Sequence, residues 1–311
     1  MRIVFMGTPD FAVSTLDALL SKDEYQVVGV FTQPDKPTGR KQILTPPPVK
    51  VRALENNIPV YQPTTLKDSK AFEDIKALNP DVIVVVAYGK FLPTDILNFP
   101  KYGCINVHGS LLPLLRGASP IQWSIVSGFD KTGVTTMFMN EGMDTGDMLL
   151  KSEVLITEDD DFSTLHDKLA TVGADLLLKT LSTLENGTAV RIKQDDALAT
   201  YAPIIKKEMG MLDFNKNATE LRNLIRGFNP WPCAYTFLGG KRLKVLSATV
   251  LSDNHNTETG LVFDIKDGLA VTCGEGTTLL LQTVQLEGSK AMPSADMLKG
   301  HPLSKGMKIG V

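Results

Sequence analysis

Three polar residues, at two places in the chain, could carry out proton-transfer chemistry together. Asn106 and His108 lie two positions apart in a segment that reads as the end of a strand, so their side chains face the same side. Asp144 lies between Gly142 and Gly146, in a tight turn that would present one side chain. A neutral imidazole can accept a proton, a carboxylate can fix its tautomer, and an amide can donate to an oxyanion. The set suits acyl-type transfer to an amine, which brings its own lone pair and needs no serine or cysteine nucleophile.

A structural interpretation of the same residues has to be weighed beside the chemical one. A lone histidine is more often a hydrogen-bonded core residue than a catalytic one. Here the strand-end position, the asparagine two residues earlier and the glycine-bracketed Asp144 favour chemistry. The strand is followed by Gly109-Ser110, by the apolar run Leu111-Leu112-Pro113 and by a helix start at Ser119-Pro120. Ligands of open α/β sheets bind at this carboxyl edge of the strands.

The elements that must position these residues alternate between strand and helix patterns. Residues 2–6, 26–32 and 81–87 read as strands, and residues 10–20 read as a helix between the first two. Such units imply a parallel sheet, so we expect an α/β domain with a Rossmann-like, mostly parallel sheet. Residues 134–139 and 149–156 add two more strands beside the Asp144 turn. The first turn, Gly7-Thr8-Pro9-Asp10, lacks the glycine fingerprint of a dinucleotide site, which disfavours a nicotinamide-dependent oxidoreductase.

The 311 residues are expected to form two domains and a linker. Leucines at helical spacing up to Gly187 close the first domain, residues 1–189, and residues 190–208 lack periodicity and read as the linker. Five short strands between residues 234 and 286, separated by glycine turns, predict a small OB-like β-barrel in residues 209–311.

Charge is distributed unevenly between the two parts of the chain. The chain from Lys206 onward contains 13 Lys and Arg and 10 Asp and Glu, whereas the first 205 residues contain 19 Lys and Arg and 25 Asp and Glu. The difference hints that a polyanion contacts the C-terminal half, although a solvated surface is the commoner explanation. Residues 33–50 form a proline-rich, basic stretch that we expect to be a long non-regular loop, which is usually functional or disordered.

Composition excludes several classes of protein. No apolar run is long enough to span a membrane, and the N-terminus has no secretory signal. The three cysteines are far apart and fit neither a metal site nor a disulfide framework. We therefore expect a cytoplasmic protein with no metal and no membrane partner.

Several longer strings together resemble one family, the 10-formyltetrahydrofolate-dependent formyltransferases, over nearly the whole chain. They are FMGTPDFAV, FTQPDKPTGRKQILTPPPVKVRA, NVHGSLLP, GMDTG and RGFNPWPCAY. The basic proline-rich loop distinguishes the chain from glycinamide ribonucleotide and sugar-nucleotide members of the family. The first of these members also lacks the C-terminal domain.

The resemblance implies transfer of the formyl group of 10-formyltetrahydrofolate to the α-amino group of methionyl initiator tRNA. It places Asn106, His108 and Asp144 at the family's catalytic positions. It places folate binding at Ser110, Leu111, Leu112 and Pro113, and tRNA binding at Arg40 and Lys41. Lys206 and Lys207, at the start of the net-positive part of the chain, are further candidates for tRNA binding. We expect the protein to be a monomer.

Some alternatives remain open. Lys206 and Lys207 could equally be solvated linker charges, and Arg116-Gly117 is expected only to shape its loop. A folate- or RNA-binding protein without catalytic activity would keep the fold but carry a damaged catalytic set, whereas all three residues are present here.

Overall fold

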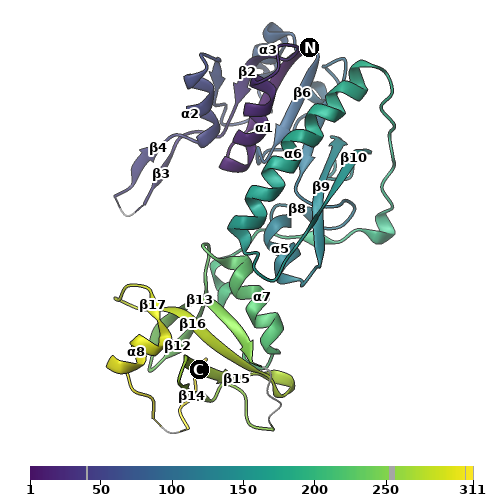
Figure 1. Cartoon of the computed structure of the whole chain (residues 1–311). Coiled ribbons are helices and arrows are strands. Elements are labelled where there is room, and N and C mark those ends of the chain that lie inside the picture. Colours follow the sequence, from purple (N-terminus) through teal and green to yellow (C-terminus); the bar gives the residue numbers. More distant parts are fainter. Residues whose placement is uncertain (40, 252–255, 305, 311) are drawn as a thin grey trace. The chain divides into compact units, whose positions relative to one another are not determined.

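The computed structural model describes residues 1–39, 41–251, 256–304 and 306–310. They form two compact units (Figure 1). The first unit comprises Met1–Pro120, Lys131–Leu155 and His166–Ala202, and the second comprises Ile121–Asp130, Ile156–Leu165 and Pro203–Val311. Among the described residues, no helix has the length and apolar character needed to cross a membrane.

A seven-stranded sheet in the order β10-β9-β7-β6-β1-β2-β5 forms the centre of the first unit. Its strands are β1 (Arg2–Gly7), β2 (Gln26–Phe31), β5 (Val60–Tyr61), β6 (Val82–Val86), β7 (Cys104–His108), β9 (Lys131–Phe138) and β10 (Met148–Leu155). The strands from β5 to β7 in this order are parallel, and β9 and β10 are added antiparallel. The mostly parallel sheet predicted from the sequence is confirmed. Every residue of β6 is buried, as expected for a β-branched strand covered on both faces.

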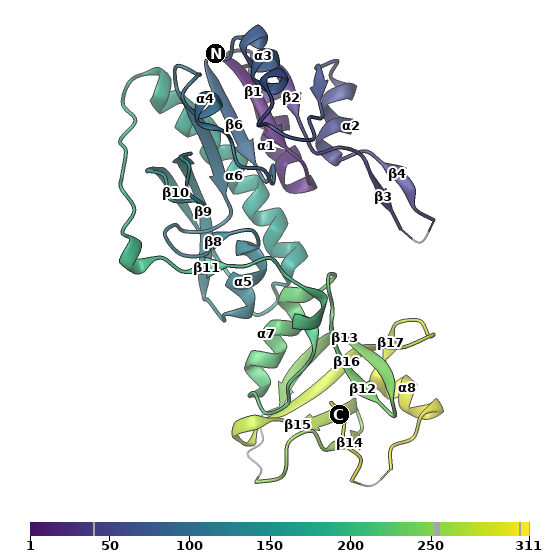
Figure 2. The same ribbon diagram turned by 180° about the vertical axis from the view of Figure 1, so that it is seen from behind.

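Helices cover both faces of this sheet (Figures 1 and 2). They are α1 (Asp10–Leu20), α2 (Pro48–Glu55), α3 (Ser69–Leu78), α4 (Thr94–Leu97) and α6 (Phe162–Glu185), whereas α5 (Pro120–Val126) belongs to the second unit from Ile121 onward. On one face Ile75 of α3 and Ile96 of α4 are fully buried in a cluster with Ile83 of β6. On the other face α6 packs so closely that a Cβ at Gly173 would lie 3.1 Å from Val107 of β7. This packing fixes the strand that carries the candidate site.

The proline-rich stretch 33–50 contains a β-hairpin, where the sequence predicted a non-regular loop. Its strands are β3 (Lys36–Thr38) and β4 (Ile43–Thr45), paired antiparallel. Each strand has three residues and all six are exposed, so there is no buried face and no alternation of polarity to detect. At the base of the hairpin the Lys50 ammonium bonds both Asp35 oxygens, at 2.9 and 2.8 Å.

The second unit is built on an antiparallel sheet in the order β12-β13-β16-β15-β14, with β17 paired to β16. Its elements are β12 (Ala234–Leu238), β13 (Lys241–Leu251), β14 (Val262–Ile265), β15 (Gly268–Thr272), β16 (Thr278–Leu286), β17 (Met292–Pro293), α7 (Ala218–Phe228), α8 (Ser294–Gly300), η2 (Lys207–Gly210) and η3 (Gly274–Gly276). The sheet curls into a half-barrel, which confirms the barrel-like C-terminal domain predicted from the sequence. Leu221 and Ile225 of α7 fill its core together with Val245 and Leu281.

Candidate active site

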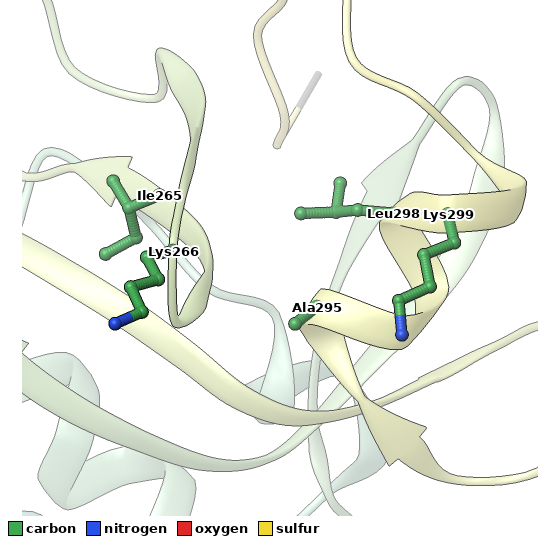
Figure 3. Close-up of a pocket in the computed structure, with 5 residues that line it drawn as sticks. All are labelled: Ile265, Lys266, Ala295, Leu298 and Lys299. Carbon is green, nitrogen blue, oxygen red and sulfur yellow. The ribbon is translucent and has the colours of Figure 1, made fainter.

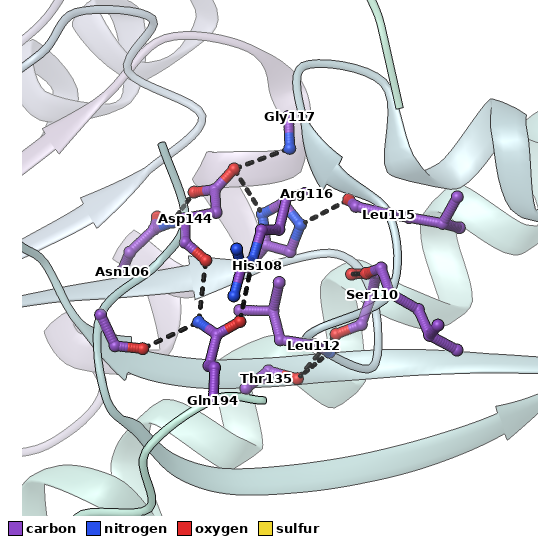
Figure 4. Close-up of polar contacts among 12 residues, drawn as sticks. Asn106, His108, Ser110, Leu112, Leu115, Arg116, Gly117, Thr135, Asp144 and Gln194 are labelled. Atoms are coloured by element: carbon purple, nitrogen blue, oxygen red, sulfur yellow. Dashed lines mark hydrogen bonds and ion pairs between the residues drawn. The ribbon is translucent and has the colours of Figure 1, made fainter. Parts of the chain in front are cut away.

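The imidazole of His108 is held at the carboxyl end of β7. Its side chain is 6% exposed, and its Nε2 lies 3.0 Å from the carbonyl oxygen of Leu115 (Figure 4). A carbonyl oxygen can only accept, so Nε2 carries the proton in this hydrogen bond. The other ring nitrogen, Nδ1, faces Asp144 at 3.7 Å from Oδ2. In the neutral ring Nδ1 therefore holds the lone pair that can take up a proton.

Asp144 reaches this imidazole from the turn between β9 and β10. The strand before this turn, β9, is antiparallel to β7 and ends with Phe138 beside Ile105, so the end of β9 does not itself lie beside His108. The turn itself directs the carboxylate toward His108. Asp144 adopts a left-handed conformation with φ of 53°, which aspartate tolerates better than most residues.

Two donors orient the Asp144 carboxylate. The backbone N–H of Gly117 donates to Oδ2 at 2.8 Å, and the Asn106 amide donates to Oδ1 at 3.4 Å (Figure 4). The structure thus brings together the three residues predicted to be catalytic. An amide donor, a proton acceptor and an anionic carboxylate converge here, and this arrangement can support attack of an amine on a carbonyl carbon.

The segment Ser110–Pro113, predicted to bind folate, is fixed by the strands beneath it. The Thr135 hydroxyl donates to the Ser110 carbonyl at 2.7 Å and accepts from the Leu112 N–H at 3.1 Å. Leu112 is fully buried in a cluster with Met137 and Met148, whereas Leu111 and Pro113 are half-buried. Leu112 therefore shapes the segment from within the core, and its two neighbours remain available to a ligand.

The residues predicted to bind tRNA lie in both units. Lys41 is exposed in the hairpin of the first unit, and Arg40 lies outside the described residues. Lys206 and Lys207 are exposed at the start of the 3-10 helix η2 in the second unit.

The pair Arg116-Gly117, which was expected from the sequence only to shape its loop, also bonds the Asp144 carboxylate through the Gly117 N–H. Arg116 is 2% exposed and Gly117 follows it in β8 (Arg116–Gly117), which pairs with β11 (Tyr201–Ala202). Gly117 has φ of 119°, and a Cβ there would lie 2.8 Å from the Ala202 carbonyl oxygen, so only glycine fits. The glycine in the Arg116-Gly117 pair was a usable signal.

Two residues that bond the segment 115–117 from far along the chain were not predicted from the sequence. Gln194 bonds Arg116 across 78 positions, and Thr200 bonds Leu115 across 85. Both lie in a stretch without periodicity, so neither composition nor spacing identifies them.

Burial changes the acidity of two groups near the site. Burial raises the pKa of the Cys104 thiol, at the start of β7, to about 12, so that this thiol is a poor nucleophile. Burial also lowers the pKa of Lys151 on β10, whose ammonium donates to the Leu112 carbonyl. Lys151 therefore supports the predicted folate segment from the adjacent strand.

A separate pocket of about 460 Å³ in the second unit has a different character. Ile265, Lys266, Ala295, Leu298 and Lys299 line it (Figure 3). Lys299 is paired with Asp296 at 2.6 Å. The lining includes no group that could act as a general base at neutral pH, so this pocket is no rival to the site on β7. No cluster of three His, Cys, Asp or Glu that could hold a metal occurs in the described part of the chain.

Comparison with protein families identifies both parts of the chain. Residues 1–181 match the family model described as formyl transferase, and residues 204–302 match the model described as formyl transferase, C-terminal domain. Methionyl-tRNA formyltransferase of Caldanaerobacter subterraneus subsp. tengcongensis is 52% identical over 307 residues, which cover 98% of this chain and 99% of the relative. The enzyme of that name from Clostridioides difficile is 48% identical, with full coverage of both chains.

Solved structures agree on the fold. A sugar 3N-formyl transferase crystallised with dTDP and 5-N-formyl-THF has a TM-score of 0.67 at 18% identity, covering 93% of this chain and 99% of that one. Methionyl-tRNA formyltransferase from Clostridium thermocellum has a TM-score of 0.54 at 21% identity, covering 80% and 93%.

Proposed function

Because this chain belongs to the formyl transferase family, we propose that it transfers the formyl group of 10-formyltetrahydrofolate to the α-amino group of methionyl initiator tRNA. The product is N-formylmethionyl-tRNA, used in translation initiation. The observation that carries this proposal is the convergence of Asn106, His108 and Asp144 at the end of β7. The relatives that share about half of this sequence over its full length bear the name of that activity.

The chemistry of the three side chains fits a formyl group as the reacting centre. The co-substrate supplies a carbonyl carbon whose oxygen gains negative charge when an amine attacks. The Asn106 amide can donate to that oxygen, and one such donor contributes about 10² to 10³ in kcat. No metal is needed for this step, because the amide takes the place of a Lewis acid.

Proton movement follows from the tautomer of His108. Nε2 keeps its proton because it donates to the Leu115 carbonyl, so Nδ1 accepts the proton that the attacking amine must lose. The resulting imidazolium is stabilised by Asp144, whose Oδ2 lies 3.7 Å from Nδ1. The same proton then leaves with the folate nitrogen as its bond to the formyl carbon breaks. His108 thus returns to its starting form.

The substrates are assigned to separate surfaces. Ser110, Leu111, Leu112 and Pro113 form the folate segment, of which Leu111 and Pro113 are accessible for direct contact. The tRNA is bound by the hairpin with Arg40 and Lys41 and by Lys206 and Lys207. In support, all three of these lysines are exposed.

The organisation we propose is a monomer that works in the cytoplasm. The three catalytic side chains come from one chain, and the three cysteines are buried thiols, as suits a reducing compartment. We propose residues 1–189 as the catalytic domain, residues 190–208 as the linker and residues 209–311 as a domain that contributes to tRNA binding. The first part of this linker, up to Ala202, packs with the first unit.

One assay tests the function. Purified protein is given 10-formyltetrahydrofolate and a mixture of methionyl initiator tRNA and glycinamide ribonucleotide as competing acceptors. We expect the formyl group on the methionine of the tRNA. Formylation of the ribonucleotide instead would assign the chain to another acceptor class, and no transfer to either acceptor would refute the proposal.

A further inference from the structure

Residues 190–202, termed the strap, bind to the elements that carry the active site. At its start Ile192 exchanges two 2.8 Å backbone hydrogen bonds with Met148, the first residue of β10. The short helix η1 (Asp196–Leu198) follows. At its end β11 pairs with β8, and the Ala118 N–H donates to the Ala202 carbonyl at 3.0 Å. The strap therefore belongs to the first unit, and it connects the two sides of the site.

Gln194 of the strap fixes the turn that presents Asp144. Its side chain is buried, and its Nε2 donates to the carbonyls of Asp144 and Gly146, both at 2.8 Å (Figure 4). Its Oε1 accepts from Arg116 Nε at 3.0 Å. The Arg116 guanidinium also bonds Asp196 of the strap at 2.7 Å. Both donors of the Gln194 amide are thus used on the backbone of this one turn.

Thr200 of the strap fixes the residue that holds the imidazole. Its Oγ1 accepts from the Leu115 N–H at 2.8 Å, and its carbonyl accepts from the Arg116 N–H at 2.8 Å. Leu115 has φ of 57°, in the left-handed region that a leucine rarely adopts, so it needs such bonds to stay there. The Leu115 carbonyl is the group that receives His108 Nε2. A chain of hydrogen bonds therefore leads from Thr200 to the catalytic ring.

We propose that the strap is a positioning element of the catalytic centre, in which Thr200 sets the His108 tautomer through Leu115 and Gln194 sets the Asp144 carboxylate through its turn. Thr200 therefore positions the ring that carries Nδ1, and Gln194 positions the carboxylate that carries Oδ2, 3.7 Å away. This inference rests on the proposed function for its kinetic consequence. The alternative is a tether that adds stability and nothing to the chemistry.

Two nearly isosteric substitutions in the full-length protein separate these roles. Thr200→Val removes the hydroxyl acceptor, and Gln194→Met removes both amide donors. We expect each to lower single-turnover formyl transfer by roughly tenfold to a hundredfold, because small displacements of reacting groups have effects of that size. The dissociation constants for folate and for tRNA should stay near wild type. Thr200→Ser should restore turnover, and Val190→Thr, a matched change at an exposed position of the strap, should have no effect.

Histidine-nitrogen NMR supplies a readout that a tether would leave unchanged. The chain has four histidines, and the His108 signals are assigned as those missing from His108→Asn. We expect wild type to show the Nε2–H form and Thr200→Val to show a mixture of tautomers. The proposal would be overturned if both variants kept wild-type turnover and the wild-type His108 tautomer. It would also be overturned if turnover fell only in proportion to a lower Tm or a weaker substrate affinity. If wild type failed to formylate tRNA, the function would be wrong, but the NMR comparison would still decide whether the strap positions the ring.

Discussion

The chemistry at the residue scale depends on which nitrogen of His108 faces Asp144. Nε2 is committed to the Leu115 carbonyl, so the working lone pair is on Nδ1. Nδ1 lies 3.7 Å from Oδ2 of Asp144. Nδ1 can therefore accept a proton, and the carboxylate can stabilise the imidazolium that results. The side chains that do the chemistry are ordinary, and two left-handed residues, Leu115 and Asp144, supply their geometry.

Asp144→Asn tests whether the charge of this carboxylate is used. The amide can still accept from the Gly117 N–H, so the turn should persist, but it cannot stabilise an imidazolium. We expect single-turnover kcat to fall by on the order of 10² to 10⁴, with folate and tRNA affinities nearly unchanged. Normal turnover, or a loss explained entirely by weaker substrate binding, would make Asp144 a structural turn residue.

The proposed mechanism uses no nucleophile from the protein, and Cys104, on the same strand as His108, allows this to be tested. Burial raises its pKa to about 12, so its thiol stays protonated at any pH where the protein is assayed. We expect a thiol reagent at pH about 8, near the pKa of an unperturbed cysteine, to label Cys104 only after unfolding. Cys104→Ala should keep formyl transfer near wild type. Rapid labelling of the native protein together with loss of activity would instead indicate a reactive thiol at the site.

Helices and strands could be predicted from the sequence wherever one of their faces is buried, because apolar residues then recur at helical or strand spacing. The strand Cys104–His108, the helix beginning at Pro120 and the long helix α6 follow the expected pattern. The β3–β4 hairpin could not be predicted, because all its strand residues are exposed. The direction of β9 could not either, since a strand pattern says nothing about whether its partner is parallel.

The candidate site was partly predictable for the same physical reason. Asn106 and His108 share a strand, so their relation is local and spacing reveals it. The residues that fix the loop beside them, Gln194 and Thr200, bond Arg116 and Leu115 from 78 and 85 positions away, and no sequence pattern surrounds either residue. A sequence without aligned relatives contains no signal for such contacts.

The hairpin is the element whose role in RNA binding can be tested alone. Lys41 is exposed on a hairpin that buries none of its strand residues, so its charge is not needed for folding. Lys41→Ala should lower kcat/KM for charged tRNA and reduce the salt dependence of binding by roughly one unit of slope for each phosphate that is no longer neutralised. Folate affinity and Tm should not change. Lys22→Ala, an exposed lysine just after α1, is the control, and equal effects of both changes would exclude a specific role for the hairpin.

The two units of the whole molecule are interleaved along the chain. Residues 121–130 and 156–165 belong with the C-terminal sheet. Within that unit Arg226 of α7 donates to the carbonyls of Thr157 and Asp160, at 2.7 and 2.9 Å. The Arg222 guanidinium lowers the pKa of the Glu158 carboxyl beside it. A cut between the proposed domains therefore removes partners from segments that precede it by many residues.

Two fragments, ending at Ala189 and at Ala202, test the proposed domains at this scale. Both lack α7, which packs against α5 at Gly227, so both should melt at a lower temperature than the full chain. Both should use charged tRNA poorly, because the net-positive part of the chain has gone. Only the longer fragment keeps Gln194 and Thr200, so it alone should keep the Nε2–H form of His108.

Folate binding and histidine-nitrogen NMR on the two fragments separate these effects. Similar folate affinity in both would show that the Thr135 bonds suffice to hold Ser110–Pro113, without the bond that the Thr200 N–H of the strap makes to the Pro113 carbonyl at 3.3 Å. The same histidine signal in both fragments would contradict the positioning role of residues 190–202. Full efficiency with charged tRNA in the longer fragment would mean that the C-terminal sheet is not an RNA-binding module.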